Sequence, residues 1–270
     1  MNELFETFKP QNSIVKKFVD YYYLDIKPDN VTSEFQCFPH FNNTISLYKS
    51  HIRLKDREMV FDKNAKPYQI FTPLRENILT VKQLGKLHRV VVVFHPLGIQ
   101  QFYRGLDFSN YITDVKFFSE KELEQLFSTE KTEVLINLLD KFLEKRLIKF
   151  DSPVVEKSLQ YIFNHYKNFS VSEISKELGV SRQHLTRVFK SHLGVSLKKF
   201  HEIFVFRKTI NKKLSEKSNQ NFAEIAYEFN FSDQSHLIKT YKNLTKCTPK
   251  SFFDKGTFLD KKYTFWHLKF

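Results

Sequence analysis

The sequence has 270 residues and a formal net charge of +13; 41% of its residues are hydrophobic and 27% are charged, which is typical of a soluble globular protein with room for two domains. No apolar run approaches the roughly 20 residues of a membrane-spanning helix, and the first residues do not have the layout of a signal peptide, so we expect a cytoplasmic protein. The two cysteines, Cys37 and Cys247, lie in different halves of the chain, which excludes a disulfide framework or a Cys-rich zinc site.

Short alternating or apolar runs separated by prolines predict β-strands in the first 95 residues. The clearest runs are Thr44–Tyr48, Tyr68–Phe71 and Arg89–Phe94. Beyond Pro96 the apolar residues recur every three or four positions, at 123–127 and again at 134–143, which predicts packing helices. We therefore expect residues 1–150 to form an α+β domain, a small β barrel or sandwich followed by helices.

A linker is expected in the stretch Leu147–Pro153, because this stretch contains a proline and does not continue the helical stripe. The positive charge lies mainly beyond this linker. Residues 1–150 contain 22 Lys and Arg against 19 Asp and Glu, whereas residues 151–270 contain 21 against 11. Cations neutralise phosphates and release counterions, so the excess favours a polyanionic partner. A lysine-rich solvated surface would give the same count.

Two segments of the second half are copies of one another. Ser170–Gln183 aligns with Asn221–Gln234 at an offset of 51, and five of the aligned residues are identical. After one inserted residue the match resumes at an offset of 52, with identical pairs such as Leu185 with Leu237 and Phe200 with Phe252. Such an internal repeat indicates one structural unit used twice.

Each copy predicts a helix, a tight turn and a second helix. An N-cap residue precedes a Glu by three positions in both copies, namely Ser170 with Glu173 and Asn221 with Glu224, as in a capping box. The first helices are expected to end near Gly179 and Asn230, because Gly and Asn tolerate the left-handed conformation. Ser181 and Ser232 then follow as the expected N-caps of the second helices.

The second helix of each copy is predicted to bury one stripe and expose a polar face. The buried stripes are Leu185, Val188 and Phe189 in the first copy and Leu237, Tyr241 and Leu244 in the second. The outward candidates are Arg182, Gln183, Thr186, Arg187 and Lys190 in the first copy and Gln234, Ser235, Ile238, Lys239 and Lys242 in the second. Arg can bond guanine, Gln can bond adenine and Thr can contact the thymine methyl group. Such a face is usually only solvated, but the repeat, the turn and the charge together favour DNA binding.

These segments resemble the AraC/XylS family of bacterial transcription regulators. The resemblance rests on Ile174–Ser196, on Arg207 with Leu214, and on Ile225–Pro249. It implies that residues 151–270 form an all-α DNA-binding domain of seven helices with two helix-turn-helix units. A long central helix, about Leu197 to Leu214, would place the two recognition helices in successive major grooves. By position, the base-contacting sites would be Gln183, Thr186 and Arg187 in the first unit and Gln234, Ser235 and Lys239 in the second.

The sequence departs from the family pattern at four positions. Asn230 and Lys246 stand where Gly is usual, Asn211 where Ala is usual, and Phe253 where Arg is usual. All four positions bear on the packing of the second unit.

The resemblance implies promoter DNA as the partner and a sensing or dimerising role for residues 1–150. RNA polymerase, a small-molecule effector on residues 1–150 and a second copy of the chain are further candidate partners, and no membrane partner is expected. The apolar face of helix 132–147 is more often core than interface, yet it is the leading candidate for dimerisation. That face contains Leu135, Leu138, Leu139, Phe142 and Leu143. Tyr21, Tyr22 and Tyr23 suit either strand packing or a ligand pocket.

No metal, cofactor or catalytic site is expected. The four histidines at 40, 51, 88 and 95 lack the spacing of a metal motif, and the sequence contains no nucleophile elbow or phosphate-binding loop. Two distant cysteines exclude the repair methyltransferases, which carry a similar DNA-binding domain and use a cysteine cluster. We interpret the chain as a sequence-specific transcription regulator, most simply an activator. A cupin-type enzyme tethered to this DNA-binding domain and an architectural DNA binder remain alternatives.

Overall fold

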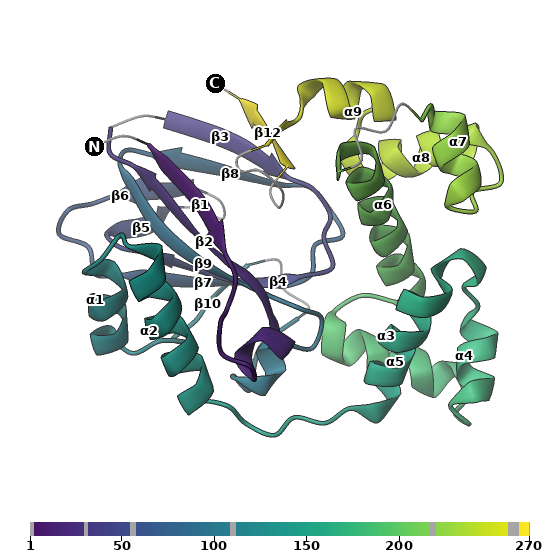
Figure 1. The fold of residues 1–270 in the computed structure, drawn as a ribbon, viewed down its shortest axis with the longest axis horizontal. Helices are drawn as coiled ribbons and strands as arrows, with labels where there is room; N and C mark the ends of the chain where they lie inside the picture. Colours follow the sequence, from purple (N-terminus) through teal and green to yellow (C-terminus); the bar gives the residue numbers. More distant parts are fainter. Residues whose placement is uncertain are drawn as a thin grey trace.

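The computed structural model describes residues 3–29, 32–54, 58–108, 112–215, 220–258 and 265–269. A β-rich N-terminal part is followed by a helical C-terminal part (Figure 1), which confirms the predicted fold class. The strands of the N-terminal part are β1 (Leu4–Phe8), β2 (Val19–Lys27), β3 (Thr32–Cys37), β4 (Asn43–Tyr48), β5 (His51–Leu54), β6 (Glu58–Phe61), β7 (Tyr68–Thr72), β8 (Leu79–Leu84), β9 (Leu87–Phe94) and β10 (Thr113–Asp114). No helix of the described residues is long and apolar enough to cross a membrane.

The strands form two sheets of six strands each. The first has the order β1-β2-β9-β4-β7-β10, and its neighbours are antiparallel. The second has the order β11-β12-β3-β8-β6-β5, with β11 (Thr257–Phe258) and β12 (Phe265–Lys269) from the C-terminal end, and contains one parallel pair, β6 with β8. The central strand β9 is rich in valine, and a β-branched side chain packs well on a pleated surface.

Side chains alternate across β2, so its three consecutive tyrosines have different surroundings. Tyr22 belongs to the hydrophobic core beneath helices α1 (Glu120–Phe127) and α2 (Thr132–Lys145). Tyr21 and Tyr23 face the other way and line a cavity between the two sheets. Tyr22 therefore fits the strand-packing interpretation, and Tyr21 and Tyr23 line a cavity whose role as a ligand pocket stays a prediction.

Helix α2 uses most of its apolar face within the N-terminal part. Leu135, Leu139, Phe142 and Leu143 are buried in the core, Leu138 is half-buried against it, and Val134 is exposed. The carboxylate of Asp140 on the same helix accepts hydrogen bonds from the backbone N–H groups of Gln11 (2.8 Å) and Asn12 (2.7 Å) and from the hydroxyl of Tyr22 (2.7 Å). This helix is therefore fixed to the sheet by packing and by a satisfied buried carboxylate.

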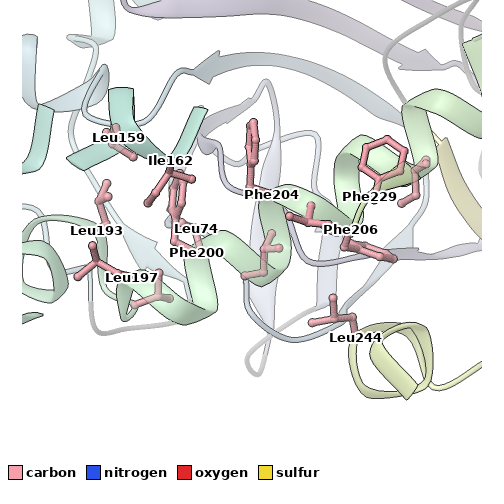
Figure 2. Packing of buried hydrophobic residues seen from close by; sticks show 14 of the residues in the cluster. Leu74, Leu159, Ile162, Leu193, Leu197, Phe200, Phe204, Phe206, Phe229 and Leu244 are labelled. Atoms are coloured by element: carbon pink, nitrogen blue, oxygen red, sulfur yellow. The ribbon is translucent and has the colours of Figure 1, made fainter. Parts of the chain in front are cut away.

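The helical part has one continuous hydrophobic core. Its helices are α3 (Pro153–His165), α4 (Val171–Glu177), α5 (Arg182–Leu193), α6 (Leu197–Ser215), α7 (Phe222–Glu228), α8 (Gln234–Thr245) and α9 (Pro249–Lys255). Helix α6 matches the predicted central helix. In Figure 2, Leu197 of α6 lies near Leu193 of α5, and Phe206 of α6 lies on the side of Phe229 and Leu244. One helix thus packs against both units.

The core of the helical part includes residues of the β-rich part, notably Phe38, Leu74 and Leu97. The ring of Phe38 lies 4.8 Å from that of Phe252 in α9. At the other end, the Nε2 of Gln100 donates a hydrogen bond of 2.8 Å to the carbonyl of His192 in α5. The first helix-turn-helix unit and α9, the helix that follows the second unit, are therefore held against the β-rich part.

The chain returns to the β-rich part after the last helix. Strand β11 (Thr257–Phe258) pairs with β12 (Phe265–Lys269), and β12 pairs with β3 through three residues. No strand was predicted in the C-terminal half, so these two strands correct the all-α expectation for residues 151–270. Strand β12 covers an edge of β3 that would otherwise leave its backbone groups open to pairing.

Candidate nucleic-acid interface

The first helix-turn-helix unit is built from local capping bonds. The Oγ of Ser170 accepts a hydrogen bond of 3.3 Å from the backbone N–H of Glu173 and caps α4. Gly179 in the turn has a φ of 64°, the left-handed conformation predicted for it. The Oγ of Ser181 accepts a bond of 3.1 Å from the N–H of His184 and caps α5. These caps confirm the prediction for the first unit.

The second unit has the same order of elements with one shift. Asn221 and Glu224 form a complete capping box at α7. The predicted N-cap of the next helix, Ser232, is wrong: Asp233 caps α8, and its Oδ1 accepts a bond of 2.7 Å from the N–H of His236. The second copy is one residue longer than the first, so α8 begins one position later than the alignment predicts. The side chain at its N-cap is then an aspartate, which accepts the amide hydrogen bond.

The second helix of each unit exposes the side chains that were predicted to face outward. Leu185 and Phe189 are buried in α5 and Val188 is half-buried, whereas Leu237, Tyr241 and Leu244 are buried in α8. Arg182, Gln183, Thr186, Arg187 and Lys190 are exposed on α5. Gln234, Ser235, Lys239 and Lys242 are exposed on α8, and Ile238 is half-buried. Their contacts with bases stay a prediction.

A hollow beside α5 gathers most of the cationic candidates. Its lining includes Arg182, Gln183, Thr186, Arg187, Lys190 and Lys198. Ser170, the N-cap of α4, Ser172 of α4 and His201 of α6 also line it, and these three were not predicted as contacts. The ring of His201 stacks on that of Phe169 at 4.2 Å. The four cations and the absence of acidic residues in this lining make the hollow suitable for a phosphate backbone.

Arg187 is held loosely within this surface. Its side chain is exposed, and its Nη2 lies 3.3 Å from the Nδ1 of His184, one turn earlier on the same helix. An exposed guanidinium with one weak neighbour keeps most of its five donors for a ligand. Arg187 can therefore turn toward a base edge or a phosphate.

Two departures from the family pattern fall on left-handed backbone. Asn230 and Lys246 have φ values of 59° and 62°, a conformation that strongly favours glycine. The Nδ2 of Asn230 donates a bond of 2.6 Å to the carbonyl of Lys167. Lys246 ends α8, and its Nζ makes a long contact of 3.4 Å with the carbonyl of Asn243. The backbone therefore keeps the left-handed conformation at both positions although the usual glycine is missing.

A cavity of about 90 Å³ lies between the two sheets of the β-rich part. Strands of both sheets line it, with Tyr21 and Tyr23 on one side and Phe35 on the other. Arg207 of α6 also lines it, which brings the helical part to the cavity wall. The described residues contain no group of three or more His, Cys, Asp or Glu placed to hold a metal ion.

Comparison with protein families gives one match, a helix-turn-helix domain over residues 174–255. The match covers the second half of the first unit's opening helix, both recognition helices and the helix between them. It starts after Ser170 and ends at the last residue of α9, so it contains all ten outward candidates of the two recognition helices.

The curated relatives are bacterial regulators. An uncharacterized HTH-type transcriptional regulator from the cgkA 5′ region of Pseudoalteromonas carrageenovora is 30% identical over 112 residues, which are 41% of this chain and 64% of that protein. The arabinose operon regulatory protein of Escherichia coli is 25% identical over 126 residues, 43% of this chain and 42% of that protein. Among solved structures, ToxT from Vibrio cholerae is 14% identical with a TM-score of 0.48, covering 93% of this chain and 98% of that one.

Proposed function

We propose that this chain, whose residues 174–255 form a helix-turn-helix domain of the AraC type, is a sequence-specific DNA-binding transcription activator. The observation that carries the proposal is the repeated unit: two capped helix-turn-helix motifs, each with an exposed polar and basic recognition face, are joined by the single helix α6. An isolated basic helix would not support this function so strongly, because a solvated face has the same composition.

The two units are proposed to read two successive major grooves. Residues of α5 and α8 reach base edges in this proposal, while Lys198 at the start of α6 contacts a phosphate. Half or more of protein–DNA hydrogen bonds go to the backbone, and the four cations of the hollow suit that role. Because both recognition helices belong to one chain, a single copy would occupy an asymmetric site.

The β-rich part is proposed to sense a small molecule in the cavity between its sheets. The cavity supports this role because it is bounded by both sheets and by Arg207, a residue of the helix that joins the two DNA-binding units. We further propose that the chain contacts RNA polymerase when it activates transcription. A second copy could dock on the exposed and half-buried residues of α2, Val134 and Leu138, since the remaining apolar face is already used.

Genome-wide mapping of bound sites, followed by binding assays of the full chain on those sites, tests the proposal. We expect a shared motif upstream of genes, transcription that falls when the chain is deleted, and an affinity that decreases steeply with salt, as phosphate contacts require. Binding spread evenly along the chromosome would indicate an architectural DNA binder instead. No salt-dependent binding to any DNA would contradict the proposal.

A further inference from the structure

The cavity between the sheets contains more positive charge than its surroundings balance. Among the described residues that line the cavity, four are arginines and none is Asp or Glu. Two of these arginines have carboxylate partners: Arg53 pairs with Asp114 at 2.9 Å, and Arg89 pairs with Asp25. Arg75 and Arg207 have no such partner among the described residues. Both side chains are half-buried, and withdrawing a cation from water without a counter-charge is unfavourable, so these two residues point to a missing anion.

The hydrogen bonds around these two guanidinium groups are incomplete. Arg207 donates from Nε to the carbonyl of Pro39 at 2.6 Å and from Nη2 to the carbonyl of Phe38 at 2.8 Å. The Nε of Arg75 is buried and has no acceptor in the described part of the chain. Buried donors in proteins almost always have a partner. A ligand in the cavity with a hydrogen-bond acceptor would supply the partner that the Nε of Arg75 lacks.

Arg75 and Arg207 are close enough to affect each other. Burial, together with the positive charge of Arg75, lowers the pKa of Arg207 to about 9. Arg207 therefore keeps its proton at neutral pH, and the two like charges repel each other at the cavity wall. His40 beside them stays neutral, because burial and both arginines hold its pKa well below its usual range. An anion between the guanidinium groups would remove this repulsion.

The size and walls of the cavity limit what the anion is. A water molecule needs about 10–15 Å³ of such space, so a cavity of about 90 Å³ has room for a molecule of roughly six to nine non-hydrogen atoms. Aromatic side chains make up much of the wall, namely Tyr21, Tyr23, Phe35 and Tyr48. A small organic anion fits this combination better than a free inorganic ion, because it buries apolar surface against the rings.

We infer that the cavity binds a compact organic carboxylate, which pairs with Arg75 and Arg207 and places its apolar body among the aromatic rings. Arg75 belongs to the β-rich part, and its backbone N and O both bond to His40 at 3.0 Å. Arg207 belongs to α6, between the two DNA-binding units. The ligand would therefore join the two parts of the molecule, and any affinity difference between two arrangements of those parts would shift their populations. This regulatory step rests on the proposed function, whereas the binding step does not.

Calorimetry of the full chain tests the binding step with sodium benzoate as the probe. Benzamide, which has the same shape without the charge, is the control ligand, and dodecanoate tests the size limit. We expect benzoate to bind at least tenfold more tightly than benzamide, because charge-assisted bidentate pairs to Arg are strong, and more tightly than dodecanoate. Equal affinity for benzoate and benzamide would overturn the anion site. Tighter binding of dodecanoate would overturn the size argument.

Variants assign the site to its residues. Arg75→Gln removes one cation, and we expect it to weaken benzoate binding at least tenfold while benzamide binding is unchanged. Arg75→Lys keeps the positive charge but loses the planar guanidinium that can donate two parallel hydrogen bonds, so it should bind benzoate with intermediate affinity. Arg104→Gln removes an exposed cation that does not line the cavity and should bind benzoate like the original chain. Equal losses in Arg75→Gln and Arg104→Gln would show a general charge effect and contradict the site.

DNA affinity of the full chain with and without saturating benzoate tests the regulatory step. We expect a change of at least fivefold in the original chain and in Arg104→Gln, and none in Arg75→Gln. Benzoate binding without a change in DNA affinity would overturn the regulatory step and leave the site intact. If the chain bound no DNA in either condition, the proposed function would fail, and the calorimetry would still decide whether the cavity is an anion site.

Discussion

The Nε of Arg207 donates a hydrogen bond of 2.6 Å to the carbonyl oxygen of Pro39, residues that lie 168 positions apart in the sequence. This bond joins α6, the helix between the two DNA-binding units, to the loop that follows β3. The same loop contacts α9 through Phe38 and Phe252. The β-rich part therefore contacts both the helix that joins the two DNA-binding units and the helix that follows the second unit.

Within the first unit, Arg187→Ala and Lys198→Ala should have different effects. If Arg187 makes a bidentate base contact, its loss costs about 1–3 kcal/mol and removes discrimination at one or two base positions. Lys198 is exposed at the start of α6. If it contacts a phosphate, its loss weakens binding to all DNA sequences about equally and lowers the slope of log affinity against log salt concentration by about one unit. Affinities on a set of single-base-substituted sites measure both effects. A uniform loss for Arg187→Ala would make it a backbone contact, and a base-selective loss for Lys198→Ala would reverse the roles.

Lys246→Gly should stabilise the protein. A left-handed conformation costs a residue with a side chain about 1–2 kcal/mol, and the added freedom of glycine in the unfolded chain offsets about 0.4–1 kcal/mol of that. We expect a net gain of about 0.5–1 kcal/mol in the free energy of unfolding, measured by urea denaturation. Lys157→Gly is the matched control, because Lys157 is exposed within α3. It should lose about 1 kcal/mol, and a loss of the same size for Lys246→Gly would contradict the strain.

Much of the DNA-binding surface could be predicted from the sequence because its signals are local. The cap at Ser170, the left-handed Gly179 and the buried Leu185 lie within 16 residues of one another, and propensity and periodicity describe such distances well. The bond from Arg207 to Pro39 and the pairing of β12 with β3 join distant segments. No short-range pattern encodes those contacts.

The lining of the cavity could also be predicted only in part from the sequence. The run of three tyrosines in β2 predicts that alternate residues face opposite sides. Which side faces the cavity depends on how β2 pairs with β9 and on where α1 and α2 pack. The alignment of the two copies pairs Ser232 with Ser181 and so predicts Ser232 as the N-cap of α8, whereas the one inserted residue moves that role to Asp233.

Asp140→Ala should destabilise the β-rich part strongly. The change leaves two part-buried backbone N–H groups and the buried hydroxyl of Tyr22 without their acceptor, and a buried unsatisfied group costs about 1–3 kcal/mol. We expect a loss of about 3 kcal/mol in the free energy of unfolding. Tyr22→Phe removes only one of these bonds and should lose about 1 kcal/mol. Equal losses in the two variants would show that the backbone bonds to Asp140 contribute little.

Stability should decrease as the pH falls from about 6.5 toward 4, in part because of His51. This side chain is 2% exposed, and burial lowers its pKa to about 4. The unfolded chain then binds a proton in this range that the folded protein does not, so protonation favours unfolding. We expect His51→Gln to lose less stability than the original chain between pH 7 and pH 5, measured by urea denaturation. An identical loss in both proteins would contradict a buried neutral His51.

Hydroxyl-radical footprinting of the full chain on one of its mapped sites tests the central claim most directly. Two recognition helices held by α6 on one face of the duplex should protect two major-groove segments about one helical turn, roughly 34 Å, apart. Arg187→Ala should weaken protection of the first segment only, and Lys239→Ala that of the second only. A single short protected segment, unchanged by Lys239→Ala, would contradict the account, because the second unit would then not read DNA.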